Sequence, residues 1–266
     1  MSHSPQLSAC IVAYCDYEEV CAAARSVLQH TPGENFRLFL VDNGSPDGCG
    51  KQLAATDFAD PRVTVLPLPQ NLGFGKGHNA VLPRLQSQVH FILNPDILIH
   101  DDLLGGMAAW LLAHPGAAMA TPQLYFPDGR IQHLPRRKPT PWLLLARQLA
   151  DRLPNSAFAR ADAHYTMQDE DLSAPREIEF CTGSFAAIRT DVFRAIGGFD
   201  PDYFMYVEDA DLTQKVLQRG KVYFLPQFAA THAWHRAPMR DAGKFKMQLA
   251  SMGRYFRKWG AGAGRV

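Results

Sequence analysis

The chain has 266 residues, is 47% hydrophobic and 20% charged, and carries a formal net charge of +1. This composition is typical of a soluble globular protein of one large domain, and the near-neutral charge excludes a dedicated nucleic-acid binder, which usually has a surplus of basic residues. No apolar stretch approaches the roughly 20 residues of a membrane span, and residues 1–10 lack the features of a signal peptide, so we expect a cytoplasmic protein.

The first half of the chain alternates short apolar runs with segments of helical spacing. Strands that alternate with helices indicate a parallel sheet covered on both faces, so we expect an α/β fold with a Rossmann-like, mostly parallel central sheet. The expected strands are residues 7–14, 36–41, 63–66 and 89–93, and the expected helices are residues 18–29, 50–59 and a segment that begins near Gly75.

Polar residues follow three of these strands where each one ends. They are residues 14–16, residues 42–45 and the sequence Asn94-Pro95-Asp96. In open α/β sheets, ligands bind beyond the carboxyl ends of the strands. We therefore expect these segments to converge on one edge of the sheet and to form the functional site there.

A glycine-rich segment, "NLGFGKGHN" at residues 71–79, follows the third strand. It lacks the spacing of a dinucleotide fingerprint or a P-loop, which argues against both of those sites. Gly73, Gly75 and Gly77 would let the backbone approach a ligand before a helix whose N-terminus favours an anion. Lys76 and His78 among these glycines favour a functional loop, and the alternative is an ordinary flexible turn.

Asp96 is a single carboxylate at the end of the strand at residues 89–93. Asp101 and Asp102 are better N-cap candidates for the expected helix at residues 103–112, which leaves Asp96 to contact a metal or a ligand. Pro95 fixes the backbone next to it and so presents the carboxylate in a defined direction.

Residues 129–176 are basic, then amphipathic, then acidic, and the basic part is interrupted by prolines. Basic residues beside Trp142 and the leucines at 143–145 suit an anionic lipid surface, so the segment is a candidate lid or membrane-surface patch. An ordinary helix packed on the sheet fits the pattern equally well.

The last third regains order with an expected strand at residues 178–181, a small-residue turn, helices at residues 190–196 and from about Glu208, and a strand at 222–225. Glu208, Asp209 and Asp211 lie within one turn. Carboxylates this close repel one another, so one of them can act as a base near neutral pH, or all can lie near a cation. An acidic helix N-terminus stabilised by the helix dipole is the other interpretation.

Together these motifs resemble the family 2 inverting glycosyltransferases, and specifically their rhamnosyltransferase-like branch. The resemblance runs from Leu7 to Trp259 and rests on "VDNGSPDG", "NLGFGKGHN", "LNPDI", "CTGSFAAIRTDVFRAIGGFDPDYFMYVEDADL" and "HAWHRAPMR…RYFRKWG". It implies a GT-A fold and a single domain over residues 1–266. Residues 7–125 would form the nucleotide-sugar-binding half, and residues 126–266 the acceptor-binding half with C-terminal helices.

The resemblance also implies roles for individual residues. Asp209 would be the catalytic base, with Glu208 as its neighbour and runner-up, and Asp96 with His232 would bind Mg²⁺ or Mn²⁺. The nucleotide would be bound by Ala13, Tyr14, Asp42, Gly73, Phe74, Lys76 and Asn94. The donor and acceptor sugars would be bound by Thr182, Gly183, Ser184 and Arg236.

The implied reaction moves a sugar, expected to be L-rhamnose, from a dTDP- or UDP-sugar to a lipid-linked or polysaccharide acceptor in bacterial surface glycan synthesis. The protein would work in the cytoplasm, with peripheral contact to the inner face of the plasma membrane and no nucleic-acid partner. A nucleotidyltransferase would need a glycine-rich, basic loop after the first strand, where this chain has "VAYCDYEE". An inactive nucleotide- or glycan-binding module is supported by the neutral Asn94 and opposed by Asp96 and Asp209.

Overall fold

The computed structural model describes residues 6–150, 152–233 and 242–262. Their strands form one ten-stranded mixed sheet in the order β3-β2-β1-β4-β9-β6-β10-β5, with β7 paired to β6 and β8 paired to β10. The strands are β1 Leu7–Ala13, β2 Phe36–Asp42, β3 Val63–Pro67, β4 Val89–Leu93, β5 Ile97–Leu98, β6 Ala117–Tyr125, β7 Ile131–Gln132, β8 Arg176–Glu177, β9 Phe185–Arg189 and β10 Lys221–His232.

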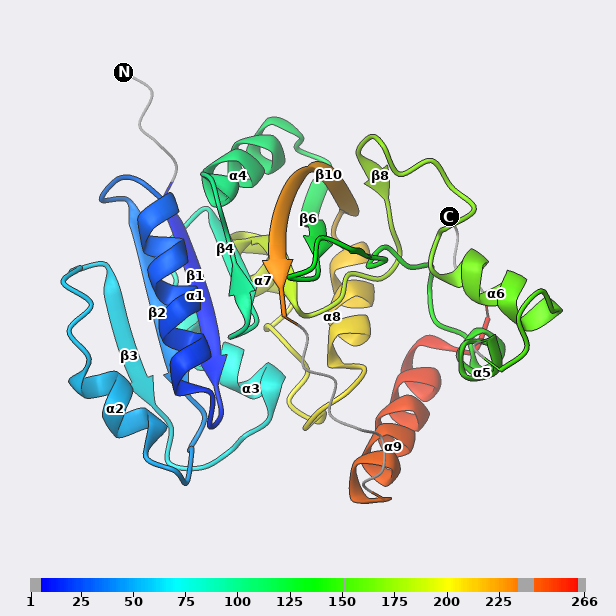
Figure 1. The fold of residues 1–266 in the computed structure, drawn as a ribbon, viewed down its shortest axis with the longest axis horizontal. Coiled ribbons are helices and arrows are strands. Elements are labelled where there is room, and N and C mark those ends of the chain that lie inside the picture. The colour runs from blue at the N-terminus through cyan, green and yellow to red at the C-terminus, as the bar shows by residue number, and fades with distance from the viewer. Residues whose placement is uncertain (1–5, 151, 234–241, 263–266) are drawn as a thin grey trace.

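Helices cover both faces of this sheet (Figure 1). Helices α1, α2 and α4 pack on one face, and α3, α7 and α8 pack on the other. The helices are α1 Tyr17–His30, α2 Cys49–Ala55, α3 Phe74–Asn79, α4 Leu103–Ala113, α5 Pro141–Ala150, α6 Ala157–Tyr165, α7 Thr190–Ala195, α8 Glu208–Leu217 and α9 Ala242–Trp259, with a 3₁₀ turn at Leu82–Arg84.

The first four strands run parallel and form the part of the sheet that the sequence pattern predicted. Successive side chains of a strand point to opposite faces, and in β1 Ala9 and Ile11 face one helical layer whereas Cys10 and Val12 face the other. Because both faces are covered, β1, β2 and β4 are almost entirely buried and largely apolar and do not alternate, as is typical of a buried parallel sheet. The expected α/β fold is confirmed.

The second half of the sheet is mixed, because β9 runs antiparallel to both β4 and β6. The strand expected at residues 178–181 is wrong in position. The strand lies after the small-residue turn, at Phe185–Arg189, and not before it. Its antiparallel pairing with β4 continues into a hydrogen bond from the Asn94 backbone N–H to the Ser184 carbonyl, at 2.9 Å. The small-residue turn therefore lies directly beside the end of β4.

The two longest strands, β6 and β10, pair in parallel and were missed or shortened by the sequence prediction. Pro122 interrupts the pattern of β6, and Pro226 that of β10. Pro226 falls within a register shift between Leu225 and Ala229, so the bulge accommodates a residue that has no N–H to donate. This pairing carries β10 to His232 at the same edge where β4 ends.

Residues 129–176 form packed structure and not a loose basic surface. Helices α5 and α6 pack against each other. Arg137 forms ion pairs of 2.8 Å with Asp169 and 2.6 Å with Glu170, and Lys138 donates to the Trp259 carbonyl at 2.9 Å. Two of the basic residues, Arg137 and Lys138, thus make contacts within the protein, whereas Arg130 is exposed. Among the helices of the described residues, none has the length and apolar character needed to cross a membrane.

Candidate active site

Three connected cavities form a trough beyond the carboxyl ends of β1, β2 and β4. Their volumes are about 290, 430 and 480 Å³, and we call them the first, middle and outer cavities. The first and middle cavities share Phe74, Asn94 and His232, and the middle and outer cavities share Arg136 and Asp209. The trough thus runs from the parallel half of the sheet to the helices α5 and α9.

The first cavity collects the polar strand ends that the sequence predicted to converge. Tyr14, Asn43 and Asp96 all line it, from three different strand ends. A 3.0 Å hydrogen bond from the Cys15 N–H to the Ser45 Oγ joins two of these ends directly. The convergence is confirmed, and Asn43, which was not singled out, holds the glycine loop by accepting the Leu72 N–H at 3.0 Å.

Several residues expected to bind the nucleotide lie near the first cavity without lining it. Ala13 is fully buried, and its carbonyl accepts the Asn43 N–H at 2.9 Å. Asp42 is 5% exposed and its carboxylate packs against Gly50, where an added Cβ would come within 2.2 Å of Oδ2. Lys76 is partly buried on α3. Their assigned roles stay predictions.

Two of the three glycines in the glycine-rich segment at residues 71–79, the glycine loop, allow close packing on the core, which is not the role that the sequence predicted. Gly73, with φ +86°, lines the first cavity, and a Cβ there would lie 2.0 Å from the Phe204 carbonyl oxygen. A Cβ at Gly75 or Gly77 would instead clash with Phe199 or Val12, both at 2.8 Å, so these two glycines let α3 pack on the core. The expectation that they admit a ligand is wrong.

His78 is likewise a core residue and does not face the trough. It is fully buried, its ring centroid lies 4.6 Å from that of Phe74, and burial holds its pKa well below the ordinary value. A neutral imidazole in aromatic surroundings supports packing, so the functional interpretation of His78 is wrong.

Asp96 and His232 meet at the boundary between the first and middle cavities. The His232 Nε2 atom lies 3.3 Å from the Asp96 Oδ1 and 3.4 Å from the Asn94 Nδ2. Gln132 donates from Nε2 to the His232 carbonyl at 2.8 Å, so its Oε1, 2.9 Å from the His232 Nδ1, must be the acceptor. Nδ1 therefore carries a proton, and Nε2 is the atom turned toward Asp96.

This arrangement fits a divalent cation. A carboxylate oxygen and an imidazole Nε2 converge, and a hydrogen bond to Nδ1 fixes the ring, as it commonly does for metal-bound histidines. No group of three or more histidine, cysteine or acidic side chains suited to a metal occurs within the described ranges. A cation held here would therefore take its remaining ligands from water and phosphate oxygens, which is the preference of Mg²⁺.

Asp209 and Glu208 open helix α8 at the far side of the middle cavity. Both Asp209 oxygens accept backbone N–H groups, Oδ2 from Gly183 at 3.0 Å and Oδ1 from Ala210 at 2.8 Å. Tyr206 and Val207, just before the helix, have φ values of 69° and 68°. Such left-handed backbone is costly for a β-branched residue, and it is a strain of the kind that gathers at functional sites.

The two acids differ in how they are placed. Glu208 is 7% exposed, and its Oε2 has no hydrogen-bond partner among the described residues. Burial raises the pKa of both carboxyl groups, and the charge of Asp209 adds to the rise for Glu208. The N–H groups that Asp209 accepts oppose the rise in its own pKa. Asp209 also lines the outer cavity, so it lies at the junction of the two.

Asp211, the third acid of this turn, points elsewhere. It is fully buried, accepts the Trp259 Nε1–H at 2.7 Å and pairs with Lys258 at 2.8 Å. Its role is to anchor helix α9 to α8.

The small-residue turn lines the middle cavity with Thr182, Gly183 and Ser184, and a 3.1 Å hydrogen bond joins the two hydroxyls. Arg236, expected to bind the sugars, lies outside the described residues. Gln132 and Arg136 line the trough and were not predicted. The sequence did not mark these two residues as site residues, because basic residues and prolines dominate the pattern of residues 129–176.

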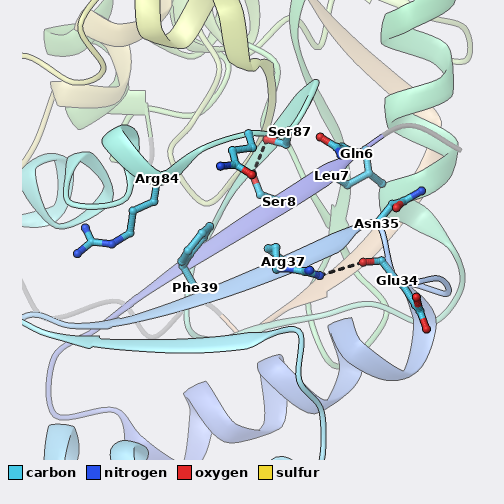
Figure 2. Close-up of a pocket in the computed structure, with 10 residues that line it drawn as sticks. Gln6, Leu7, Ser8, Glu34, Asn35, Arg37, Phe39, Arg84 and Ser87 are labelled. Carbon is cyan, nitrogen blue, oxygen red and sulfur yellow. Dashed lines mark hydrogen bonds between the residues drawn. The ribbon is translucent and has the colours of Figure 1, made fainter. Parts of the chain in front are cut away.

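A separate hollow of about 120 Å³ lies at the opposite end of the sheet, where Ser8, Arg37 and Ser87 line it beside the starts of β1 and β2 (Figure 2). The Arg37 guanidinium donates to the Glu34 carbonyl at 2.9 Å, and the two serine hydroxyls lie 2.7 Å apart. Ligands of such sheets bind at the carboxyl ends of the strands, so this hollow is not the substrate site.

The family match covers most of the segments that line the first cavity. The profile of Glycosyl transferase family 2 matches residues 8–197, which include every strand end of the first cavity except β10. The chain belongs to glycosyl transferase family 2. This match confirms the predicted membership of family 2. The chain is therefore an enzyme of the glycosyltransferase class.

Two curated relatives of this family 2 chain are rhamnosyltransferases, which agrees with the predicted rhamnosyltransferase-like branch. The N-acetylglucosaminyl-diphospho-decaprenol L-rhamnosyltransferase of Mycobacterium tuberculosis is 28% identical over 221 residues, which are 77% of this chain and 68% of that protein. Rhamnosyltransferase WbbL of Escherichia coli is 27% identical over 198 residues, 70% of each chain.

Solved glycosyltransferases share the fold. GalNAc-T7 with UDP, GalNAc and Mn²⁺ superimposes with a TM-score of 0.71 at 16% identity, over 96% of this chain and 49% of that one. The mannosyltransferase PcManGT from Pyrobaculum calidifontis with GDP-Man and Mn²⁺ gives 0.61 at 16% identity, over 96% and 65%. The chain thus spans about half the length of the first structure, and the expected GT-A fold is confirmed.

Proposed function

We propose that this family 2 enzyme transfers L-rhamnose, with inversion, from a dTDP- or UDP-sugar to a lipid-linked or polysaccharide acceptor of the bacterial cell surface. The observation that carries the proposal is the trough itself, with Asp96 and His232 on one side of the middle cavity and Asp209 on the other. The names of the two rhamnosyltransferase relatives support the choice of sugar.

In the proposed mechanism the nucleotide occupies the first cavity, between Tyr14 and the Asn43-held glycine loop. Asp96 and His232 would hold Mg²⁺ or Mn²⁺, and a cation bound there would stabilise the negative charge of a diphosphate leaving group. Gln132 keeps the His232 Nε2 directed at the site. The Mn²⁺ in the two solved structures supports this choice of cation.

The acceptor hydroxyl enters from the outer cavity and meets Asp209 at the junction. Asp209 accepts the hydroxyl proton as that oxygen attacks the anomeric carbon from the face opposite the diphosphate. The Gly183 and Ala210 N–H groups hold the carboxylate in place and favour its charged form. The position of Asp209 between two cavities supports it over Glu208 as the base.

A panel of nucleotide sugars tests the proposal by thermal unfolding with and without Mn²⁺. Bound ligand raises the apparent stability by mass action, so dTDP-L-rhamnose or UDP-L-rhamnose with Mn²⁺ is expected to raise the Tm most. Asp96→Ala is expected to remove the Mn²⁺-dependent part of the rise. Equal stabilisation with and without Mn²⁺ would exclude the metal role, and no response to any nucleotide sugar would exclude the reaction.

A further inference from the structure

The outer cavity has an unusual lining, because it combines two arginines with mostly apolar walls. Arg136 and Arg147 contribute the charge, and Leu144, Phe180 and Met252 are among the apolar side chains. Helices α5 and α9 both contribute to the lining, through Leu144 and Met252. The cavity is therefore suited to a molecule that is anionic at one end and apolar at the other.

Arg136 is the one buried arginine of the described residues, and it lacks the close partners that a partly buried arginine such as Arg189 has. It is 8% exposed, and its guanidinium makes a single long hydrogen bond of 3.5 Å, to the His133 carbonyl, among the described residues. Arg189, by contrast, donates to the Ala117 and Leu111 carbonyls at 2.8 and 2.7 Å. In the described part of the chain no carboxylate lies within ion-pair distance of Arg136.

Aromatic rings hold the Arg136 guanidinium in position, with the centroids of Tyr165 and Phe180 at 5.9 and 5.8 Å. Burying a charge without a pair is costly, so this guanidinium is kept charged at a cost to stability. Burial lowers the pKa of Arg136, and the nearby charge of Arg147 acts in the same direction, whereas Tyr165 and Asp209 oppose it. A bound anion would offset the cost of the buried charge on Arg136 and the repulsion between Arg136 and Arg147.

Arg147 provides the second charge of the cavity. Its side chain is 34% exposed and contacts Asp162 at 3.3 Å, which leaves most of its five donors available. Two guanidinium groups facing one cavity match a diphosphate, because each planar fork can bind two phosphate oxygens at once.

The two helices that line the cavity also expose large apolar side chains to solvent. Trp142 and Leu145 of α5 are 52% and 50% exposed, and Phe245 and Leu249 of α9 are 46% and 52% exposed. Large side chains of this kind on helices beside an apolar cavity mark an interaction site. A hydrocarbon chain leaving the cavity would cover them.

We propose that the outer cavity is the acceptor site and that Arg136 and Arg147 bind the diphosphate of an isoprenoid-type lipid whose chain follows α5 and α9. The proposal rests on the proposed function, because the sugar carried on that diphosphate would present its hydroxyl to Asp209. It assigns the specificity for a lipid diphosphate over a soluble glycan to these two side chains.

Calorimetric titration tests the site without any transfer reaction. Farnesyl diphosphate, inorganic pyrophosphate and farnesol are titrated in EDTA, which prevents binding through a metal at Asp96. Wild type is expected to bind farnesyl diphosphate more tightly than either of the other two. Arg136→Met and Arg147→Met are each expected to weaken it about tenfold or more, which is the value of a hydrogen bond to a charged group.

Arg130→Met is the matched control, because Arg130 lies in the same segment, is 73% exposed and pairs with Asp128. It is expected to bind farnesyl diphosphate as wild type does. Arg136→Met is also expected to unfold at the same temperature as wild type or higher, since it removes an unpaired buried charge. If it fails to fold, Arg136→Lys and Arg147→Met replace it in the titration.

Three binding results would contradict the proposal. Pyrophosphate binding as tightly as farnesyl diphosphate would make the cavity a free-anion site, farnesol binding as tightly would make it a merely apolar groove, and unchanged affinity in both arginine variants would exclude the assigned residues. Each of these overturns the proposal. Failure of the proposed function is separate, because it would appear as absence of transfer from every nucleotide sugar while the arginine-dependent titration persists.

Discussion

At the scale of single residues, the placement of Glu208 has a consequence for stability. Its carboxyl is buried with an unpartnered oxygen next to Asp209, and burial raises its pKa. The folded state therefore keeps a proton on Glu208 at pH values where the unfolded chain has lost it. Stability is lost as the pH rises from the ordinary carboxyl range toward the raised pKa.

Glu208→Gln is expected to remove this loss. The variant should match wild type near pH 4 and should exceed its free energy of unfolding by roughly 1–3 kcal/mol at pH 8, the cost of an unsatisfied buried group. Urea unfolding at both pH values measures the difference. A variant that is less stable than wild type at pH 8 would show that the Glu208 charge is compensated in the folded protein.

Also at this scale, the sequence pattern pointed to the acids of the trough and did not point to Gln132 or Arg136. Asp96 stands out because it is a single carboxylate at the end of an apolar strand, and Asp209 because it lies in a cluster of three acids to which the family resemblance gives a role. Gln132 and Arg136 had no such signal, since their role depends on β7 pairing with β6 and on the bridge between Arg136 and Phe180. These pairings, one of them to Phe180 far along the chain, placed the two residues, and the apolar periodicity of residues 129–176 does not indicate them.

At the scale of elements, α9 stabilises the segment that precedes helix α8. Trp259 and Lys258 bind the buried Asp211, and the Ser251 hydroxyl donates to the Met205 carbonyl at 2.9 Å. Met205 and Tyr206 line the middle cavity. The C-terminal helix thus supports the strained backbone from which Glu208 and Asp209 project.

Asp211→Ala is expected to lower the free energy of unfolding by roughly 1–3 kcal/mol, because it leaves the Trp259 indole N–H and the Lys258 ammonium without a buried acceptor. Asp202→Ala is the control, since Asp202 is 64% exposed in its pair with Arg254 and exposed pairs contribute little. Chemical denaturation compares the two variants. Equal losses would mean that the α9 contact contributes no more than a surface ion pair.

Among the elements, the parallel strands were predictable and the antiparallel ones were not. The strands β1 to β4 are short, largely apolar runs, and polar residues stand at the ends of β1, β2 and β4. In contrast, β6 contains small residues and Pro122, and β9 follows the small-residue turn that appeared to terminate a strand. Their place in the sheet depends on pairing with β4 and β10, which no local periodicity indicates.

At the scale of the whole molecule, the sheet order explains how acids more than a hundred residues apart share one trough. Strand β9 lies between β4 and β6, so the turn at residues 182–184 is brought next to Asn94. Strand β10 then returns His232 to the same edge, and α8 begins beside the turn. In the proposed function, the first cavity would bind the nucleotide sugar and the outer cavity the acceptor.

The proposed role of Asp209, removal of the acceptor proton, is tested most directly by the rate of sugar transfer by Asp209→Asn, measured together with its affinity for the nucleotide-sugar donor. We expect unchanged donor affinity and a rate lower by about 10²–10⁴-fold, the usual contribution of a general base, with Glu208→Gln retaining the greater activity. Full transfer by Asp209→Asn would show that Asp209 is not the base.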